Sequence, residues 1–434
     1  MKKIRLFILL FFSIQTAVSA QEIFLKENQT AVKINEYFSE LAKQEKFNGN
    51  VLVALGDRVV LKKSYNMPAN IDGLKTSTDK QLMIASVAKL FVKFAFLKLA
   101  EQGGIKLDDT LNKFLSDFPR GDKITIRHLI NHQSGLPREL TDREKLSDVT
   151  LEKIVELAKK ERLQFEPGAD TLYSNIGYQT LLYILSKAAP GGYENFIKKT
   201  LLKPFAMSKT YEYNYQSPKN FSPGFDYQNK KIVPADASEL KKFESGRYYS
   251  TVDDLYKFSR GIFDPRLTSK TTAGQMLNDK GEVVHAGAID GYKSYFYTNT
   301  KTGLTYIFLS NYSQIPFVQI TKDIPDIVAN KPYKIPTKVN RTAVELSEDI
   351  LKRYVGKYVL RVDEKQKFEL RVENGKLYFA QDATKTELFP ESETVFFTDP
   401  QTDDIFEFVL DEKTKTYKMF LTTEGLRLET IKSN

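Results

Sequence analysis

The feature that most constrains this chain is an apolar run, residues 90–100, which directly follows the tetrapeptide Ser86-Val87-Ala88-Lys89. The run consists of good helix formers and stops at Gly103-Gly104, so it predicts a helix. Apolar residues occupy nearly every face, and the helix should therefore be buried on most sides. Ser86 would lie near the unpaired N–H groups of the first turn, with Lys89 one turn away on the same face. The stretch thus predicts a nucleophile beside a proton acceptor.

Ser-x-x-Lys is a weak pattern by itself. Residues 77–80 and 238–241 repeat it in polar, loop-like surroundings. The structural alternative is that Ser86 only caps a helix and that Lys89 is solvated. On the tetrapeptide alone this alternative is the better interpretation, and the later motifs reverse it.

Composition excludes several classes of function. The 434 residues include no cysteine, so a thiolate nucleophile, a disulfide and a lipoprotein anchor are excluded. Three histidines, His128, His132 and His285, form no zinc-binding pattern. The net charge of +9 is spread along the chain without a basic stripe, so nucleic acid is not an expected partner. The charge does allow contact with anionic polymers of the cell envelope.

Residues 1–20 have the pattern of a secretory signal peptide. A basic start, an apolar core over residues 6–14 and small residues at 18–20 precede Gln21. The apolar core is too short to span a bilayer comfortably, and no later segment approaches a transmembrane run. We therefore expect an exported protein, periplasmic or extracellular, with no membrane span.

The remaining chain divides into a mixed part and an all-β tail. Residues 31–46 predict an amphipathic first helix, and two β-rich runs around Gly56-Asp57 predict a hairpin. Residues 138–165 are charged and helix-prone and predict a helical subdomain. The expected domains are residues 21–330, a linker at 331–340, and an antiparallel β domain at 341–434 with a hairpin at Asn374-Gly375, for which a closed barrel is one arrangement.

Five short motifs follow one another along the first domain: Ser86-x-x-Lys89, His132-x-Ser134-Gly135-Leu136-Pro137, Pro167-Gly168, Tyr173-x-Asn175 and His285-x-Gly287. In this order and spacing they resemble the serine β-lactamase-related hydrolases, which include class C β-lactamases, D-alanyl-D-alanine carboxypeptidases, D-aminopeptidases and related esterases. Residues 203–207 and 250–255 are smaller matches, and the tail, with residues 354–358, looks like the lipocalin-like domain often appended to such proteins. The resemblance implies an α+β fold, in which helices and a helical subdomain flank an antiparallel sheet, plus a small all-β domain.

The resemblance also implies catalytic roles. Ser86 is the nucleophile, and Lys89 and Tyr173 share its proton, because an alcohol attacks poorly unless a base removes that proton. Free Tyr and Lys titrate near 10 and 10.4, so the site must shift at least one of them, and which one carries the proton at rest stays open. Asn175 is expected to hydrogen-bond Lys89 and the substrate amide.

The resemblance also assigns substrate binding to the last motif, His285-x-Gly287. His285 and Gly287 should lie on an edge strand that faces Ser86, where a glycine allows close approach of the backbones. The N–H groups of Ser86 and Ala288 should form an oxyanion hole, and an acyl substrate should lie along the strand. No metal or organic cofactor is implied.

Other candidates are expected to lie outside the chemistry. Lys301-Thr302-Gly303 looks like the third motif of penicillin-interacting enzymes, but it falls in a turn between two strands. His128 and His132 are expected to be structural, and a Ser-His-Asp triad is disfavoured because the chain has no Gly-x-Ser-x-Gly elbow. Arg247 replaces a glycine usual in the family and is either a surface residue or a ligand for a substrate carboxylate.

The sequence therefore predicts an exported serine hydrolase with a Ser86 acyl-enzyme, acting on D-amino-acid peptides or small acyl esters. The alternatives are a β-lactamase and a penicillin-binding or envelope-interaction protein without turnover. A further hypothesis treats the C-terminal domain as a lipid- or peptide-binding module. Amide, ester and β-lactam substrates share the acylation chemistry, so the sequence leaves the substrate and the oligomeric state open.

Overall fold

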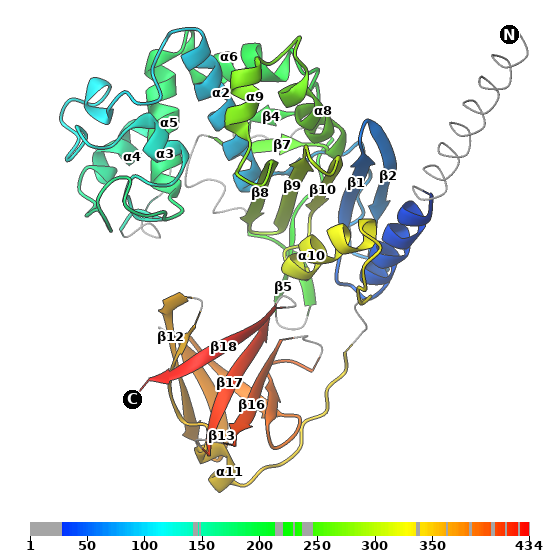
Figure 1. Ribbon diagram of the computed structural model, residues 1–434. Coiled ribbons are helices and arrows are strands. Elements are labelled where there is room, and N and C mark those ends of the chain that lie inside the picture. The colour runs from blue at the N-terminus through cyan, green and yellow to red at the C-terminus, as the bar shows by residue number, and fades with distance from the viewer. Residues whose placement is uncertain are drawn as a thin grey trace, which may run out of the picture. The chain divides into compact units, whose positions relative to one another are not determined.

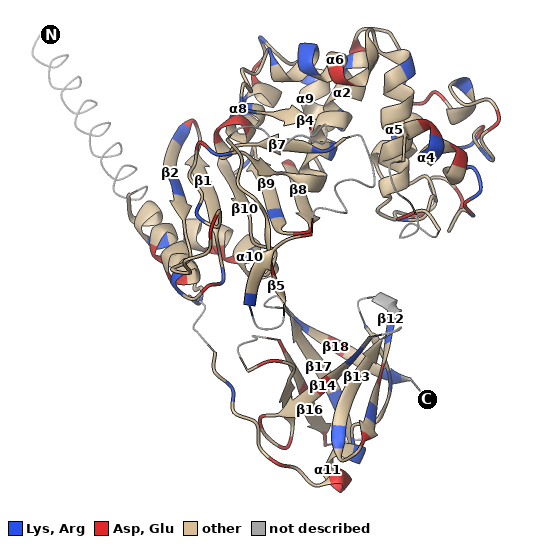
Figure 2. Cartoon of the chain, turned by 180° about the vertical axis from the view of Figure 1, so that it is seen from behind, with Lys and Arg blue, Asp and Glu red and all other residues tan. Residues whose placement is uncertain are grey.

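The computed structural model describes residues 28–141, 146, 149–212, 220–228, 231–236, 246–335, 339–361, 363–381, 384–400, 404–412, 415–423 and 426–433. The predicted signal peptide lies outside these residues. The chain packs as two compact units, Met1–Gln314 and Ile315–Asn434 (Figure 1). The domain limits expected around residues 331–340 stay a prediction. Acidic and basic residues are interspersed along the described parts of both units (Figure 2).

A five-stranded antiparallel sheet with the order β2-β1-β10-β9-β8 organises the first unit. Its strands are β1 (Gly49–Leu55), β2 (Arg58–Tyr65), β8 (Glu282–Ile289), β9 (Tyr292–Asn299) and β10 (Leu304–Ser310). The hairpin predicted around Gly56-Asp57 is confirmed, because β1 pairs with β2 across that turn. Strand β8 is an edge strand, as predicted for the segment that carries His285 and Gly287.

The first helix of this unit precedes β1, and the other helical elements lie between β2 and β8 in the chain. Residues 28–43 form the first helix, slightly earlier than the predicted 31–46. The others are η1 (Ala85–Ala88), α2 (Lys89–Glu101), η2 (Leu111–Lys113), α3 (Ile126–Ile130), α4 (Leu151–Ala158), α5 (Asn175–Ala188), α6 (Gly192–Ile197), η4 (Lys198–Leu202), α8 (Val252–Phe263) and α9 (Lys270–Met276).

Helix α2 is the predicted apolar helix, and it lies in the main core. Phe91, Phe94 and Phe96 are fully buried, and the helix contacts α5, α6 and α9. The start of the helix differs from the prediction. Ser86 lies inside the 3₁₀ turn η1, α2 begins at Lys89, and the Ser86 side chain caps neither helix. The capping alternative is therefore wrong, because the Ser86 hydroxyl has other partners.

Short sheets complete the first unit. Strands β3 (Leu82–Met83), β7 (Tyr248–Ser250) and β4 (Tyr211–Glu212) pair in the order β3-β7-β4, and β5 (Phe225–Gln228) pairs with β6 (Lys231–Pro234). Strand β3 leads directly into the turn that carries Ser86.

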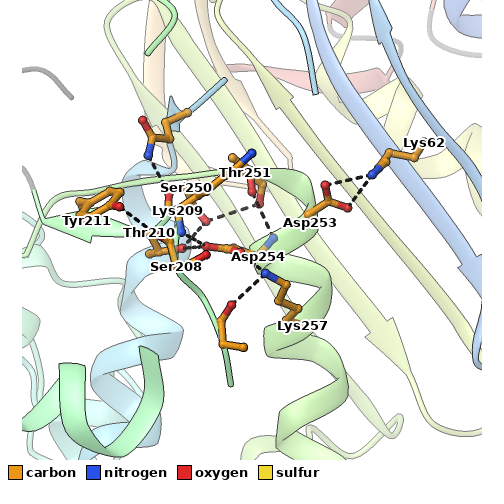
Figure 3. Close-up of polar contacts among 12 residues, drawn as sticks. Lys62, Ser208, Lys209, Thr210, Tyr211, Ser250, Thr251, Asp253, Asp254 and Lys257 are labelled. Carbon is orange, nitrogen blue, oxygen red and sulfur yellow. Dashed lines mark hydrogen bonds and ion pairs between the residues drawn. The ribbon is translucent and has the colours of Figure 1, made fainter. Parts of the chain in front are cut away.

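A buried carboxylate binds the two smaller sequence motifs together (Figure 3). Asp254, in the first turn of α8, accepts hydrogen bonds from Lys209 N at 2.6 Å and Thr210 Oγ1 at 3.0 Å. Lys257 Nζ lies 2.7 Å from the other carboxylate oxygen and 2.8 Å from the carbonyl of Ala206. Lys209 and Thr210, which follow the motif of residues 203–207, thus contact Asp254 of the motif of residues 250–255 directly. Ala206 is linked to the same carboxylate through Lys257, so both motifs stabilise the fold.

The second unit contains a closed eight-stranded barrel, so the predicted fold class is confirmed. Helices α10 (Phe317–Val328) and α11 (Glu348–Lys352) precede it. The strands are β11 (Gly356–Leu360), β12 (Asp363–Glu373), β13 (Lys376–Gln381), β14 (Thr384–Pro390), β15 (Val395–Phe397), β16 (Ile405–Asp411), β17 (Thr416–Thr423) and β18 (Leu426–Ser433).

Two local features support the barrel: the turn between β12 and β13, and aromatic side chains that pack in its interior. Asn374 and Gly375 both have positive φ, 51° and 73°, which a two-residue hairpin turn requires, so the predicted hairpin is confirmed. Tyr354 stacks on Phe408 with ring centroids 3.9 Å apart, and Phe396 packs against both at right angles or nearly so. Large side chains thus pack inside the barrel, as is usual at this strand number.

Candidate active site

Ser86 lies in a strained turn between β3 and α2. Ala85 has a φ of +44°, in the left-handed region that residues with a side chain seldom adopt. The preceding peptide groups are held, because Ile84 N donates to Tyr248 O at 2.9 Å and Ser294 Oγ donates to Ile84 O at 2.7 Å. The turn also contacts β8 and β9. Backbone strain held in this way is typical of functional positions.

The Ser86 hydroxyl meets both predicted proton partners. Lys89 Nζ lies 3.1 Å from Ser86 Oγ, and Tyr173 OH lies 2.7 Å from it. Ser86 comes from η1, Lys89 from the start of α2, and Tyr173 from the loop two residues before α5. The fold thus brings together three groups that the sequence singled out.

The loop that carries Tyr173 is bound to the loop of residues 132–137. Ser174 caps α5, its Oγ donates to Pro137 O at 2.7 Å, and its N–H donates to His132 Nδ1 at 3.0 Å. The His132 ring also packs on the Tyr173 ring, with centroids 4.5 Å apart. His132 therefore positions Tyr173, which is the structural role expected of it.

Burial shifts the pKa values of the two proton partners, Lys89 and Tyr173, in opposite directions. It lowers the pKa of Lys89 to about 7, although the Glu139 carboxylate raises that pKa, and the Arg138 charge lowers it too. Burial raises the pKa of Tyr173, against the lowering effects of its hydrogen bond to Ser86 and of Arg138. Near neutral pH the phenol keeps its proton, whereas much of Lys89 is the neutral amine. Neutral Lys89 can accept the Ser86 proton across the existing contact.

Rings surround Lys89. Its Nζ lies 5.0 Å from the ring centroid of Tyr173 and 5.5 Å from that of Tyr178. Burial, with the nearby Lys89 charge, lowers the pKa of His132 to about 3 and that of His285 to about 4, so both imidazoles are neutral at physiological pH. Neither histidine therefore places a positive charge beside Lys89 at that pH.

Asn175 has a different partner from the one expected. Its side-chain amide donates to Glu139 Oε1, and the described residues show no hydrogen bond between Asn175 and Lys89. The reason is local: Asn175 N donates to Arg138 O at 2.9 Å, which places Glu139 beside the Asn175 side chain.

Sequence reasoning missed Arg138 and Glu139. The Arg138 guanidinium lies 5.3 Å from the ring centroid of Tyr173, and Glu139 affects the pKa values of both Lys89 and Tyr173. One signal in the sequence pointed to them, because they directly follow the motif that ends at Pro137.

Strand β8 lies against the Ser86 turn. A Cβ at Gly287 would overlap Ser294 Oγ and Ile84 O, and it would lie 3.1 Å from Ser86 N. Glycine is therefore required for the close approach. His285 Nδ1 lies 2.7 Å from Ala286 O, so the neutral ring donates from Nδ1 to its own strand. Ala288 follows on the same strand and is exposed.

The remaining candidates lie outside this group. Lys301 is exposed in the turn between β9 and β10, where its N–H donates to Asn299 Oδ1 at 2.8 Å. His128 belongs to the cap of α3, where its N–H donates to Thr125 Oγ1 at 3.1 Å. Arg247 is half-buried directly before β7.

In the described part of the chain, no helix has the length and apolar character needed to cross a bilayer.

Known proteins resemble this chain over most of its length. The family model described as Beta-lactamase matches residues 34–324. Penicillin-binding protein 4* of Bacillus subtilis strain 168 is 27% identical over 437 aligned residues, which cover 89% of this chain and 95% of the relative.

Solved structures share the fold. The octameric penicillin-binding protein homologue from Pyrococcus abyssi has a TM-score of 0.61 at 23% identity, covering 92% of this chain and 99% of the homologue. The D-amino acid amidase from Ochrobactrum anthropi SV3, complexed with L-phenylalanine, has a TM-score of 0.58 at 19% identity, covering 68% of this chain and 98% of the amidase.

Proposed function

Since the chain belongs to the beta-lactamase family, whose members are generally serine hydrolases, we propose that it cleaves amide or ester bonds through an acyl-enzyme on Ser86. The observation that carries this proposal is the convergence of Lys89 Nζ and Tyr173 OH on Ser86 Oγ, at 3.1 and 2.7 Å. A nucleophile with a positioned base is the basic requirement for acyl transfer.

Acylation begins when neutral Lys89 accepts the Ser86 proton as Ser86 Oγ attacks the acyl carbon. The electron pair of the carbonyl bond moves onto its oxygen, and the N–H groups of Ser86 and Ala288 bind that oxyanion. Each such donor stabilises a transition state by roughly 3–4 kcal/mol. The close packing of Gly287 against the Ser86 turn supports this placement, because it keeps β8 beside the nucleophile.

The carbonyl then re-forms as the bond to the leaving nitrogen or oxygen breaks. The proton held by Lys89 passes to the leaving atom, directly or through the Tyr173 hydroxyl, which contacts the same Ser86 oxygen. Water attacks the ester by the reverse sequence and releases Ser86. Both half-reactions use the same proton partners.

Names of similar proteins suggest the substrate. The name of the D-amino acid amidase points to amides of D-amino acids, and D-amino-acid peptides and esters share the same acylation chemistry. The name of penicillin-binding protein 4* points to a penicillin ligand. A β-lactamase, and a penicillin-binding protein without turnover, are the alternative functions.

Two assays with Ser86→Ala as control test the proposal. We expect the wild type to hydrolyse p-nitrophenyl butyrate and the variant to be inactive. Intact mass after addition of benzylpenicillin then separates the alternatives: a persistent adduct indicates a penicillin-binding peptidase, and an adduct that decays indicates a β-lactamase. Hydrolysis that persists in Ser86→Ala would contradict the proposed nucleophile.

We also propose that the protein is exported after cleavage before Gln21. The expected result is a mature chain that starts at Gln21, measured by intact mass of the protein from a secreting host. A chain that retains residues 1–20 would contradict export by this signal.

A further inference from the structure

One short segment, residues 220–226, is hydrogen-bonded both to the chain that leads to Ser86 and to the turn at the end of β8. On the first side, Gln81 N donates to Asn220 O and Ser222 N donates to Gln81 O, both at 2.9 Å. Gln81 directly precedes β3, and β3 leads into the turn that carries Ser86. The segment therefore holds the strand from which the nucleophile turn begins.

On the second side, the 220–226 segment holds the turn between β8 and β9. Asp226 Oδ1 accepts a hydrogen bond from Gly291 N at 3.1 Å, and Tyr292 OH donates to Ser222 O at 2.8 Å. A Cβ at Gly291 would lie 2.7 Å from backbone atoms of Gly224, so the turn and the segment pack backbone against backbone. The end of β8 is thus fixed by the same segment that holds β3.

We propose that the 220–226 segment positions the oxyanion hole, with Asp226 as its main positioning residue. The inference rests on the proposed acyl-enzyme mechanism, in which the N–H groups of Ser86 and Ala288 bind the oxyanion. These two donors belong to different elements, and each lies a few residues from a contact with the segment. Because oxyanion donors act only when their spacing is preorganised, a segment that holds both elements contributes to transition-state binding.

Asp226 also connects the turn to the central sheet. The oxygen that accepts from Gly291 N accepts from Ser313 Oγ too. Next to it, Phe225 N donates to Asn311 O at 2.9 Å and Ser313 N donates to Phe225 O at 3.0 Å, and both partners follow β10 directly. The role needs an acceptor oxygen and no charge, so an asparagine, whose side-chain oxygen has two acceptor positions, should fulfil it.

The test compares Asp226→Ala with Asp226→Asn in the hydrolysis of p-nitrophenyl butyrate. We expect Asp226→Ala to lower kcat/KM about 10- to 100-fold, because a small displacement of an oxyanion donor weakens binding of the transition state. Asp226→Asn keeps the acceptor and should stay within about threefold of the wild type. Tyr292→Phe removes only the hydroxyl that contacts Ser222 O, and it should lower kcat/KM by about 3- to 10-fold.

Inhibition by phenylboronic acid provides a readout that a purely structural role would not change. Ser86 Oγ gives an electron pair to boron and its proton passes to Lys89, so the tetrahedral adduct resembles the intermediate that the oxyanion hole binds. We expect the inhibition constant to rise about 10-fold or more in Asp226→Ala, in step with the loss of kcat/KM. A residue that only stabilised the fold would lower the free energy of unfolding and leave this constant unchanged.

Asp264→Ala is the matched control. The Asp264 carboxylate also accepts a backbone N–H, that of Arg266 at 2.9 Å, in the turn that follows α8. Its other described hydrogen bonds come from the Arg266 side chain, so none of them reaches the 220–226 segment or β8. This variant should keep kcat/KM and the inhibition constant within about twofold of the wild type.

The contrary outcomes are distinct. Wild-type kcat/KM in Asp226→Ala would overturn the positioning role, as would an unchanged inhibition constant beside a lowered kcat/KM. Equal losses in Asp226→Ala and Asp226→Asn would also overturn it, because the acceptor oxygen would then not be what matters. If Asp226→Ala does not fold, Tyr292→Phe decides in the same way. A wild type that does not hydrolyse the ester contradicts the proposed function itself, and the positioning role with it.

Discussion

Lys89 is the residue on which the proposed chemistry depends. Burial lowers its pKa to about 7, and a base acts only when it is deprotonated. Activity should therefore rise with pH through about 7 and level off above it. The measurement is kcat/KM for p-nitrophenyl butyrate from about pH 5.5 to 8.5, since this neutral ester does not titrate in that range. A profile that stays flat there would show that Lys89 is not the base.

Lys301 is a residue whose sequence context imitates a catalytic motif. It is exposed in the turn between β9 and β10, and none of the described contacts joins it to Ser86. Lys301→Ala should keep kcat/KM within about twofold of the wild type, because exposed turn residues contribute little. A large loss of the Ser86 acylation rate in this variant would mean that the strand assignment at the site is wrong.

Strand β8 contributes as an element, because its backbone approaches the Ser86 turn closely. A methyl group at Gly287 would overlap Ser294 Oγ and Ile84 O. We expect Gly287→Ala to move the strand from the turn and to reduce kcat/KM on the order of 100-fold, as for loss of an oxyanion donor. The free energy of unfolding should fall by about 1–3 kcal/mol, as in overpacked cores.

Helix α9 offers the matched control for that variant. Gly274 lies in the helix, and a Cβ there would have no atom within 4 Å. Gly274→Ala should leave kcat/KM unchanged and raise stability by up to about 1 kcal/mol, since glycine is unfavourable inside a helix. If both variants lose activity alike, the effect at Gly287 does not come from close packing.

The stability of the molecule should depend on a half-buried acid, Glu212. Burial raises its pKa to about 7, while hydrogen bonds from Gly246 N and Tyr193 OH, both 2.7 Å, act in the lowering direction. The folded state therefore holds a proton that the unfolded chain releases near 4.5. This contribution is complete below about pH 4.5 and is lost as the pH rises through 7, by linkage.

Glu212→Gln tests that dependence. The difference between the unfolding free energies of variant and wild type should shift in favour of the variant by about 1–3 kcal/mol between pH 5 and 8, measured by urea unfolding. If the difference between the two unfolding free energies stays constant from pH 5 to 8, the pKa of Glu212 is the same in the folded and unfolded states.

The barrel of the second unit is the remaining part of the molecule without an assigned role. All groups of the candidate active site belong to the first unit. Phe408→Ala removes the ring stacked on Tyr354 and should destabilise the barrel by about 3–5 kcal/mol. We expect hydrolysis of p-nitrophenyl butyrate to persist in this variant, and its loss would show that the barrel is required for catalysis.

Local patterns determined much of this protein from the sequence alone. The apolar helix α2 and the hairpins at Gly56-Asp57 and Asn374-Gly375 all follow from residues that are close in the chain. Helix propensity, turn chemistry and capping act over a few residues, so their consequences can be predicted without a fold. Helix spacing also predicted that Lys89 lies beside Ser86, whereas Tyr173 was assigned to the same group through resemblance.

Tertiary structure decided the rest. The contact between Tyr173 and Ser86 joins residues 87 positions apart, and the pKa of Lys89 depends on how many atoms exclude water from it. The strained φ at Ala85 and the placement of Glu139 on Asn175 likewise arise from packing between distant segments. Desolvation and long-range contacts are properties of the assembled core, so a local pattern contains no information about their size.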